Sequence, residues 1–179
     1  MKRQLQTWCV IGLLAAGAVV LHAVESFRIV PIVNDDKVLV SFELADAFTD
    51  EVREAISSGL RTTFTYEIEL RMVVPLWVDP TICTATVTAT DQYDNLTRRH
   101  SLARTIDGRV EEAKSVQEDE AVVKRWLTTL NRLPLCQTSK LDSSRDYYVR
   151  ISARARPRGG SLLGWANPVV GQTKFTFIP

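Results

Sequence analysis

One stretch decides the fold, the residues TTFTYEIELRMVV at positions 62–74. Along it, apolar side chains alternate with polar ones, and the apolar set is Phe64, Tyr66, Ile68, Leu70 and Met72. Successive side chains of a β-strand point to opposite faces of a sheet, so the pattern predicts one long strand with a single buried face. A strand of this length is expected to bend or to carry a bulge. Just upstream, Gly59 is expected to end a helix in a left-handed conformation.

Similar alternation on both sides predicts more strands, at residues 27–33, 37–44, 83–90, 96–106, 109–116, 147–156 and 174–178. Pro31 favours an edge position for the first of them, because proline cannot donate to a strand ladder. Turn residues at 34–36, at 91–95 and at Asp107-Gly108 separate several of these segments. The links are short, so most neighbouring strands should be antiparallel.

Two short helices are predicted between the strands. Thr49 is a good helix cap, and the residues after it place an apolar stripe toward the sheet. A second helix is expected to open at the acidic residues 118–120 and to end at Pro134, with a stripe formed by Val123, Trp126, Leu127 and Leu130. The predicted fold class is therefore α+β: a mostly antiparallel β-sheet or sandwich of about eight strands with two packing helices, preceded by an N-terminal apolar helix.

The chain of 179 residues has room for one domain, predicted at 26–179, and an N-terminal extension. Its formal net charge is +1, and 24% of its residues are charged. Nucleic acid is not expected as a partner, because phosphate binding needs a basic excess.

The first 25 residues have the features of an export signal. Lys2 and Arg3 precede an uncharged run at positions 8–24, which is long for a signal core and close to the lower limit for crossing a bilayer. Residues 1–25 are therefore predicted to be either a cleaved signal peptide or an uncleaved membrane anchor. In both cases the domain should lie on the periplasmic side of the inner membrane, released or held to the membrane by this segment.

The sequence shows no catalytic constellation, so no catalytic, metal-binding or cofactor-binding residues and no cofactor are predicted. His100 is the one histidine beyond the N-terminal segment, and a lone histidine offers neither an oriented base nor a metal site. It is expected to have a structural role at or near the surface. Glu67 and Glu69 share one strand face, where a solvated surface is a simpler interpretation than an acid pair for hydrolysis.

Cys83 and Cys136 are the two cysteines beyond the N-terminal segment. In an oxidising compartment a bridge between them would close a long loop and contribute on the order of 4 kcal/mol. However, Cys83 lies on the inward side of its strand, where a buried free thiol is equally natural. Both alternatives remain open at this point.

Arginines concentrate on two predicted strands, one carrying Arg98, Arg99 and Arg104 and the other Arg150, Arg154 and Arg156. If these strands were neighbours, they would form a basic patch for an anionic partner. The alternative is a face of mixed charge, neutralised by nearby residues such as Glu111, Glu112 and Asp107.

The block from Ala55 through Ser58-Gly59-Leu60, Thr62-Thr63-Phe64 and Tyr66 to Ile68-Glu69-Leu70 resembles the opening signature of a family of exported bacterial proteins, domain of unknown function 4390. The strand at 96–102, the helix at 126–133 and the strand at 148–150 follow in the order found in that family. The resemblance implies a location in the cell envelope and carries no activity or catalytic residues.

Three functions are compatible with these patterns. The first is a non-enzymatic cell-envelope module that binds a protein or polymer through a sheet face or edge. The second is a periplasmic carrier of a small apolar ligand, with a cavity between the long strand and the helices. The third is a hydrolase that uses carboxylates and His100. The first is the leading prediction, with an envelope protein as the expected partner.

Overall fold

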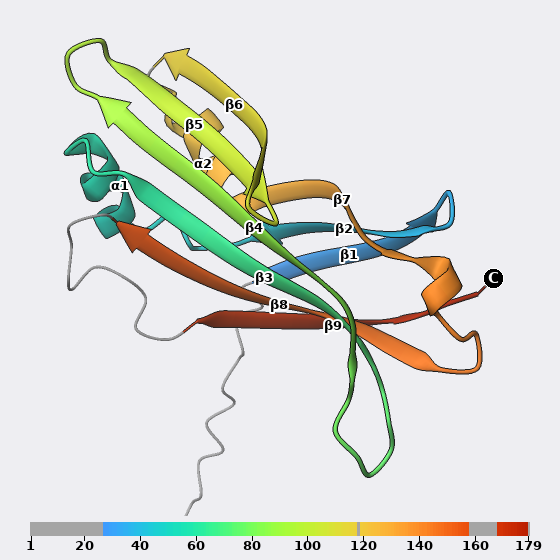
Figure 1. Ribbon diagram of the computed structural model, residues 1–179. Helices are drawn as coiled ribbons and strands as arrows, with labels where there is room; N and C mark the ends of the chain where they lie inside the picture. Colours follow the sequence, from blue (N-terminus) through green and yellow to red (C-terminus); the bar gives the residue numbers. More distant parts are fainter. Residues whose placement is uncertain (1–26, 118, 158–167, 179) are drawn as a thin grey trace, which may run out of the picture.

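The computed structural model describes residues 27–117, 119–157 and 168–178 of the chain, and the N-terminal segment lies outside them. Two antiparallel sheets face each other in the described part (Figure 1). The smaller has the order β1 (Phe27–Asn34), β2 (Lys37–Leu44) and β7 (Thr129–Gln137). The larger has the order β6 (Arg109–Gln117), β5 (Arg99–Ile106), β4 (Thr81–Asp94), β3 (Thr62–Met72), β8 (Asp146–Pro157) and β9 (Val169–Thr176). Two helices, α1 (Asp50–Ser57) and α2 (Glu120–Thr128), complete the α+β fold.

The predicted strand with a single buried face is confirmed as β3, which lies in the middle of the larger sheet. It pairs with β4 on one side and β8 on the other, and the side chains of Phe64, Ile68 and Leu70 are fully buried. The expected irregularity is a register shift against β4 between Leu70 and Arg71. Because both neighbours also turn small or apolar side chains inward, the centre of this sheet has one continuous apolar face.

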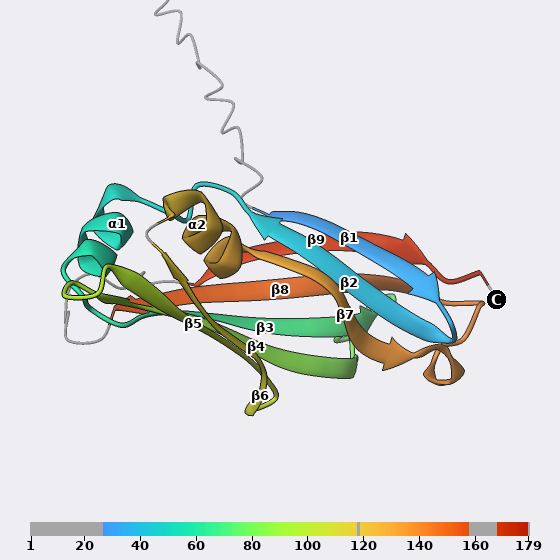
Figure 2. The ribbon, with the colours of Figure 1, turned by 90° about the horizontal axis from the view of Figure 1, so that it is seen from above.

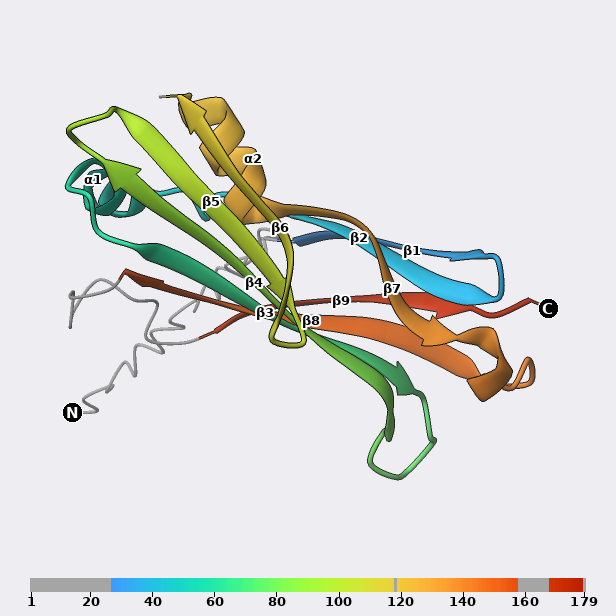
Figure 3. The same ribbon diagram turned by 45° about the horizontal axis from the view of Figure 1, so that its top comes forward.

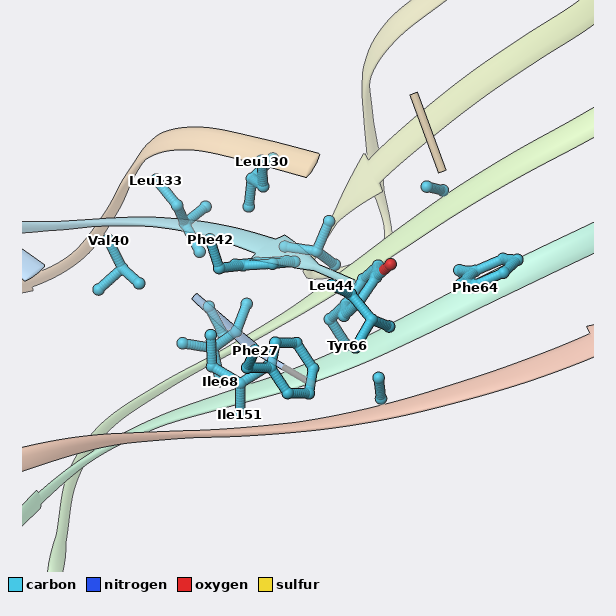
Figure 4. Close-up of a cluster of buried hydrophobic side chains, with 14 of the residues drawn as sticks. Phe27, Val40, Phe42, Leu44, Phe64, Tyr66, Ile68, Leu130, Leu133 and Ile151 are labelled. Carbon is cyan, nitrogen blue, oxygen red and sulfur yellow. The ribbon is translucent and has the colours of Figure 1, made fainter. Parts of the chain in front are cut away.

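The core fills the space between the two sheets (Figure 4). Phe42 of β2 meets Tyr66 of β3 with ring centroids 4.7 Å apart, and Phe27 of β1 meets Phe42 edge to face at 6.0 Å. Phe27 also lies directly against Gly171 of β9, where an added Cβ would come within 2.5 Å of the phenylalanine Cβ. Glycine at position 171 thus lets β1 pack closely over β9 and close one side of the sandwich.

Helices α1 and α2 lie beyond the end of the smaller sheet and cover the same face of the larger sheet (Figure 2). Thr49 caps α1 by accepting a hydrogen bond from the Val52 backbone, and Ala55 and Ile56 are buried against the larger sheet. Gly59 follows with a φ of 76°, which confirms the predicted left-handed helix end.

The second helix differs from the prediction, because α2 ends at Thr128 and residues 129–137 form strand β7. The side chains of Leu130 and Leu133 are buried, so an apolar pattern with helical spacing continues into a strand. Pairing with β2 decides the conformation here, with register shifts that accommodate the irregular segment around Arg132. Pro134 is tolerated since β7 is the outer strand of its sheet. This strand brings the number in the described residues to nine.

The predicted turn at residues 91–95 is also wrong. Strand β4 continues to Asp94, and the turn to β5 follows at residues 95–98, where the Asp94 carboxylate accepts hydrogen bonds from the Leu96 and Thr97 backbones. The reason is that the Asp91 side chain is buried and hydrogen-bonded to His100. The turn-forming residues at 91–95 do not by themselves reveal this contact. The last strand begins earlier than predicted, at Val169, because β9 pairs with β8 as far as Ala153.

Candidate functional site

Asp91 and His100 form a buried polar pair beneath the helices. The His100 Nδ1 lies 3.0 and 3.1 Å from the two carboxylate oxygens of Asp91, and the Tyr93 ring lies 4.6 Å from the imidazole. Burial raises the pKa of Asp91, and the hydrogen bond from His100 opposes that rise. His100 therefore has a structural partner, but at 6% exposure it is more deeply buried than the sequence suggested.

A small recess of about 100 Å³ reaches this pair between α1 and α2. Arg53 of α1 forms an ion pair with Glu120 of α2 at 2.9 Å and ties the helices together at the opening. Ser57 also lines the recess, but its hydroxyl donates to the backbone carbonyl of Glu54. Nucleophilic catalysis needs a nucleophile bound to its base, and in the described residues the hydrogen bonds of His100 run to Asp91. The contact with Asp91 fixes the orientation of the His100 imidazole.

Cys83 of β4 and Cys136 of β7 are joined by a disulfide, with their Cα atoms 5.7 Å apart. The bond links the two sheets across 53 residues of sequence. It holds the outer strand of the smaller sheet against the larger one, and this is a structural role. In the residues that the structure covers, no group of three or more His, Cys, Asp or Glu side chains is arranged to hold a metal ion.

The two arginine groups are not brought together. Strands β5 and β8 are separated by β4 and β3, so the condition for a shared basic patch is not met. On β8, Arg150 forms an ion pair with Glu69 and Arg154 with Glu67, each at 3.1 Å. The neutralising acids are thus the β3 glutamates rather than those expected near the hairpin. The side chain of Arg156 lies outside the described part of the chain.

The arginines near β5 have three different environments. Arg98 lies in the turn before the strand, with a φ of 53°. Arg99 points outward and donates to the Ser115 hydroxyl at 3.1 Å. Arg104 points inward, and its Nη2 donates to the backbone carbonyls of Trp126 and Thr129 at 2.7 and 3.1 Å. Arg104 therefore satisfies carbonyls at the end of α2, which helices otherwise leave without partners.

A recess of about 280 Å³ lies between the β5–β6 hairpin and α2. Trp126 lines it with two cations against its ring, since the Arg104 guanidinium carbon and the Lys114 Nζ lie 4.3 and 4.4 Å from the ring centroid. Three cations and one carboxylate line the recess, together with apolar and small polar groups: Arg104, Glu112, Lys114, Val122, Arg125, Trp126, Thr129 and Asn131. The excess of positive charge favours an anionic or carbonyl-bearing ligand.

Two buried donors of this recess have no hydrogen-bond partner in the described structure, the Nε of Arg104 and the indole Nε1 of Trp126. Burial lowers the pKa of Arg104, while Glu112 opposes that shift, and the guanidinium remains charged. Buried polar groups are almost always paired, either within the chain or with an ordered water, and these two donors are paired with no group of the described residues.

Strand β6 forms the outer edge of the larger sheet (Figure 3). Its residues Glu112 and Lys114 line this recess. In the described residues it pairs with β5 alone, and its side chains are exposed except for a half-buried Val116. At the other end of this sheet, β9 packs against β1, so the two edges differ. An edge strand with one neighbour offers backbone groups to an incoming extended chain.

The recess was not predicted. The predicted core stripe is confirmed for Trp126, which is buried. The contact of its ring with Arg104, predicted as a surface charge, was missed because the sequence does not show which sheet edge α2 approaches. One signal was present in the sequence: β6 carries charges at neighbouring positions, Glu111 and Glu112, so neither of its faces is uniformly apolar. That pattern is typical of a strand outside the core.

Together, these features define a two-sheet antiparallel α+β domain, cross-linked by a disulfide, with a cationic recess beside the edge strand β6. The chain belongs to the family described as domain of unknown function (DUF4390), whose model matches residues 23–158. No curated protein matches the chain, and no solved structure does. Among the described helices, neither α1 nor α2 is long and apolar enough to cross a membrane.

Proposed function

We propose that this domain is a non-enzymatic binding module of the cell envelope, which takes an extended segment of a partner protein along strand β6. The observation that carries the proposal is the open edge of β6, beside a recess with unpaired donors. Added strands gain affinity from backbone hydrogen bonds and specificity from pockets for alternate side chains. The recess beneath β6 supplies such a pocket.

The chemistry of the recess specifies the side chain that it would receive. Lys114 and Arg125 provide positive charge, and Trp126 provides an apolar ring with an unpaired N–H. A carboxylate of the partner would pair with the cations, and an acceptor oxygen would satisfy the indole. We therefore expect the bound segment to carry Asp or Glu at the position over Trp126.

The other candidate functions have less support. A carrier needs a cavity of about 300 Å³ or more that is mostly apolar. The carrier's cavity was predicted between the long strand and the helices, and of the two recesses there the one beside His100 has about 100 Å³ and the one beside Trp126 is lined by charges. For a hydrolase, Glu67 and Glu69 are already paired with arginines. Binding at the edge remains the proposal that most of the geometry supports.

Photo-crosslinking in intact cells tests the proposal. The full chain is expressed with a benzophenone amino acid at Glu111 or Ser115, two exposed positions on β6. Matched controls carry the same probe at Thr84 or Thr86, exposed positions on the central strand β4. We expect one defined protein adduct from the β6 positions and none from β4. Adducts of equal yield at all four positions, or none on β6, would contradict the proposal.

A second variant separates recognition from folding. Trp126→Phe keeps an aromatic ring between Arg104 and Lys114 but removes the indole N–H. Losing one hydrogen bond of about 1 kcal/mol should weaken a purified complex roughly fivefold. Trp126 is buried, so the smaller ring also leaves a cavity and lowers the stability of the free chain. The affinity is therefore measured at a temperature at which the free variant is fully folded.

A further inference from the structure

The β3–β4 connection exposes an unusual concentration of apolar side chains. Residues 73–78 have the sequence VVPLWV and no charged or hydrogen-bonding side chain other than the indole. Leu76, Trp77 and Val78 have exposed fractions of 104%, 80% and 74%. We call these three residues the apolar tip. Large adjacent apolar side chains are rarely left in water without a function, which makes the tip a candidate contact surface.

The base of the tip is rigid. The Asp79 carboxylate accepts hydrogen bonds from the Val74 backbone at 2.9 Å and from the Tyr148 hydroxyl at 3.0 Å. Arg71 donates to the Asp79 backbone carbonyl at 2.6 Å. Through these contacts β3 and β8 fix one loop, so less backbone entropy is lost when the apolar side chains make a contact.

The backbone of the loop pairs many of its own donors. The N–H of Met72 donates to Pro80, that of Val73 to Asp146 and that of Trp77 to Val74. The Val74 N–H is held by Asp79, and Pro75 has no N–H. Unpaired backbone donors oppose entry into an apolar medium, and this pairing lowers that cost.

We propose that the apolar tip inserts into the interfacial region of a lipid bilayer. Its shape favours lipid over a second protein, because Figures 1 and 3 show a projecting loop that stands away from the rest of the fold. Tryptophan, with its apolar ring and polar N–H, prefers the bilayer interface. The Asp79 carboxylate, whose pKa is lowered by its hydrogen bonds, marks the depth at which insertion stops.

The predicted N-terminal signal or anchor adds a second reason for this choice. An anchor at residues 1–25 would hold the domain at a membrane surface, where a projecting apolar loop meets lipid at high effective concentration. The tip and the β6 edge lie on different parts of the fold, so a membrane contact through the tip leaves β6 accessible (Figure 1). The inference therefore stands apart from the proposed function.

Label quenching in proteoliposomes tests it. The full chain with Cys9→Ser carries Leu76→Cys labelled with an environment-sensitive fluorophore and is reconstituted into phosphatidylcholine vesicles that contain nitroxide-labelled lipid. The matched control carries the label at Leu96→Cys, on the turn at the other end of β4, where the leucine is 95% exposed. We expect a blue shift and quenching at position 76 and neither at 96.

A further substitution checks that insertion causes the signal. Val78→Asp in the chain labelled at position 76 should abolish the quenching, while raising the salt concentration should not, because the contact is apolar. Equal quenching at positions 76 and 96, or none at 76, would overturn the proposal. A blue shift of the label at position 76 in native membranes but not in lipid vesicles would also overturn the proposal, in favour of a protein partner.

Discussion

Strands β3 and β6 belong to one sheet but have opposite surroundings. β3 has a strand on each side and a face that the smaller sheet covers, with Phe64, Ile68 and Leu70 fully buried. β6 has one neighbouring strand, and Val110 on it is 68% exposed. The comparison teaches that the two parts of this sheet differ: the sandwiched centre provides stability, and the overhanging edge is free for the binding proposed above.

The largest change in the free energy of unfolding is expected from removal of the disulfide, which joins the two sheets. Replacing both Cys83 and Cys136 with alanine should lower the free energy of unfolding by about 4 kcal/mol, since a loop of this length is no longer closed in the unfolded chain. Urea denaturation of the full chain measures the loss, with Cys9→Ser as control. A loss below about 1 kcal/mol would mean that the two sheets hold together without the bond.

A pair of truncations compares the two strands directly. Ile68→Ala on β3 should cost about 3 kcal/mol, because the site is enclosed and a cavity remains. Val110→Ala on β6 should change the free energy of unfolding by less than about 0.5 kcal/mol. Denaturation midpoints of the two variants provide the measurement. Similar losses at both positions would show that β6 packs against something that covers it in solution.

The pH dependence of unfolding tests the buried Asp91–His100 pair beneath the helices. Burial raises the pKa of Asp91 above its ordinary value of 3.8, so the folded chain binds this proton more tightly than the unfolded chain does. The contribution of Asp91 to stability is thus greatest below pH 3.8 and is lost as the pH rises through the folded-state pKa. Asp91→Asn should remove this loss.

Asp94, the last residue of β4, provides a control whose pKa shift has the opposite sign. Hydrogen bonds from the Leu96 backbone and from Thr97 lower the pKa of Asp94, so its contribution is present above the unfolded pKa and is lost as the pH falls through the folded one. Unfolding curves at a series of pH values for Asp91→Asn and Asp94→Asn should deviate from those of the unchanged chain in opposite directions. Deviations in the same direction would refute the assignment for Asp91.

The smallest change in the free energy of unfolding is expected from a substitution on the outer face of the larger sheet. Arg154→Ala removes the ion pair with Glu67, which is about half exposed on both sides. Exposed pairs contribute little, and the loss should be about 0.5 kcal/mol or less and should disappear at high salt. A loss comparable with that of Ile68→Ala would mean that this face is covered rather than solvated.

Strand β3 and the two ends of α1 were predictable because their signals are local. Alternation fixes which side chains of β3 face inward, and Thr49 and Gly59 mark the two ends of α1 through their own backbone chemistry. The family membership was likewise predictable, from the block around Ala55 to Leu70. Each of these depends on residues close together in the sequence.

Other features depended on partners far away. Residues 129–137 follow a helical stripe, yet they form β7 because β2 offers a strand to pair with and Cys83 a bond to Cys136. Asp91 begins a segment of turn-forming residues, yet it lies in strand β4 because His100 binds its carboxylate. The arginine groups were separated by the strand order, which no local pattern encodes.

By itself the sequence determined that this chain forms an antiparallel α+β domain with β3 buried on one face, since side-chain periodicity dictates which face meets water. Only the tertiary structure decided which strand remains at the edge, which donors lack partners and where the apolar tip projects. These depend on the order of strands in the sheet, which is set by the packing of distant segments.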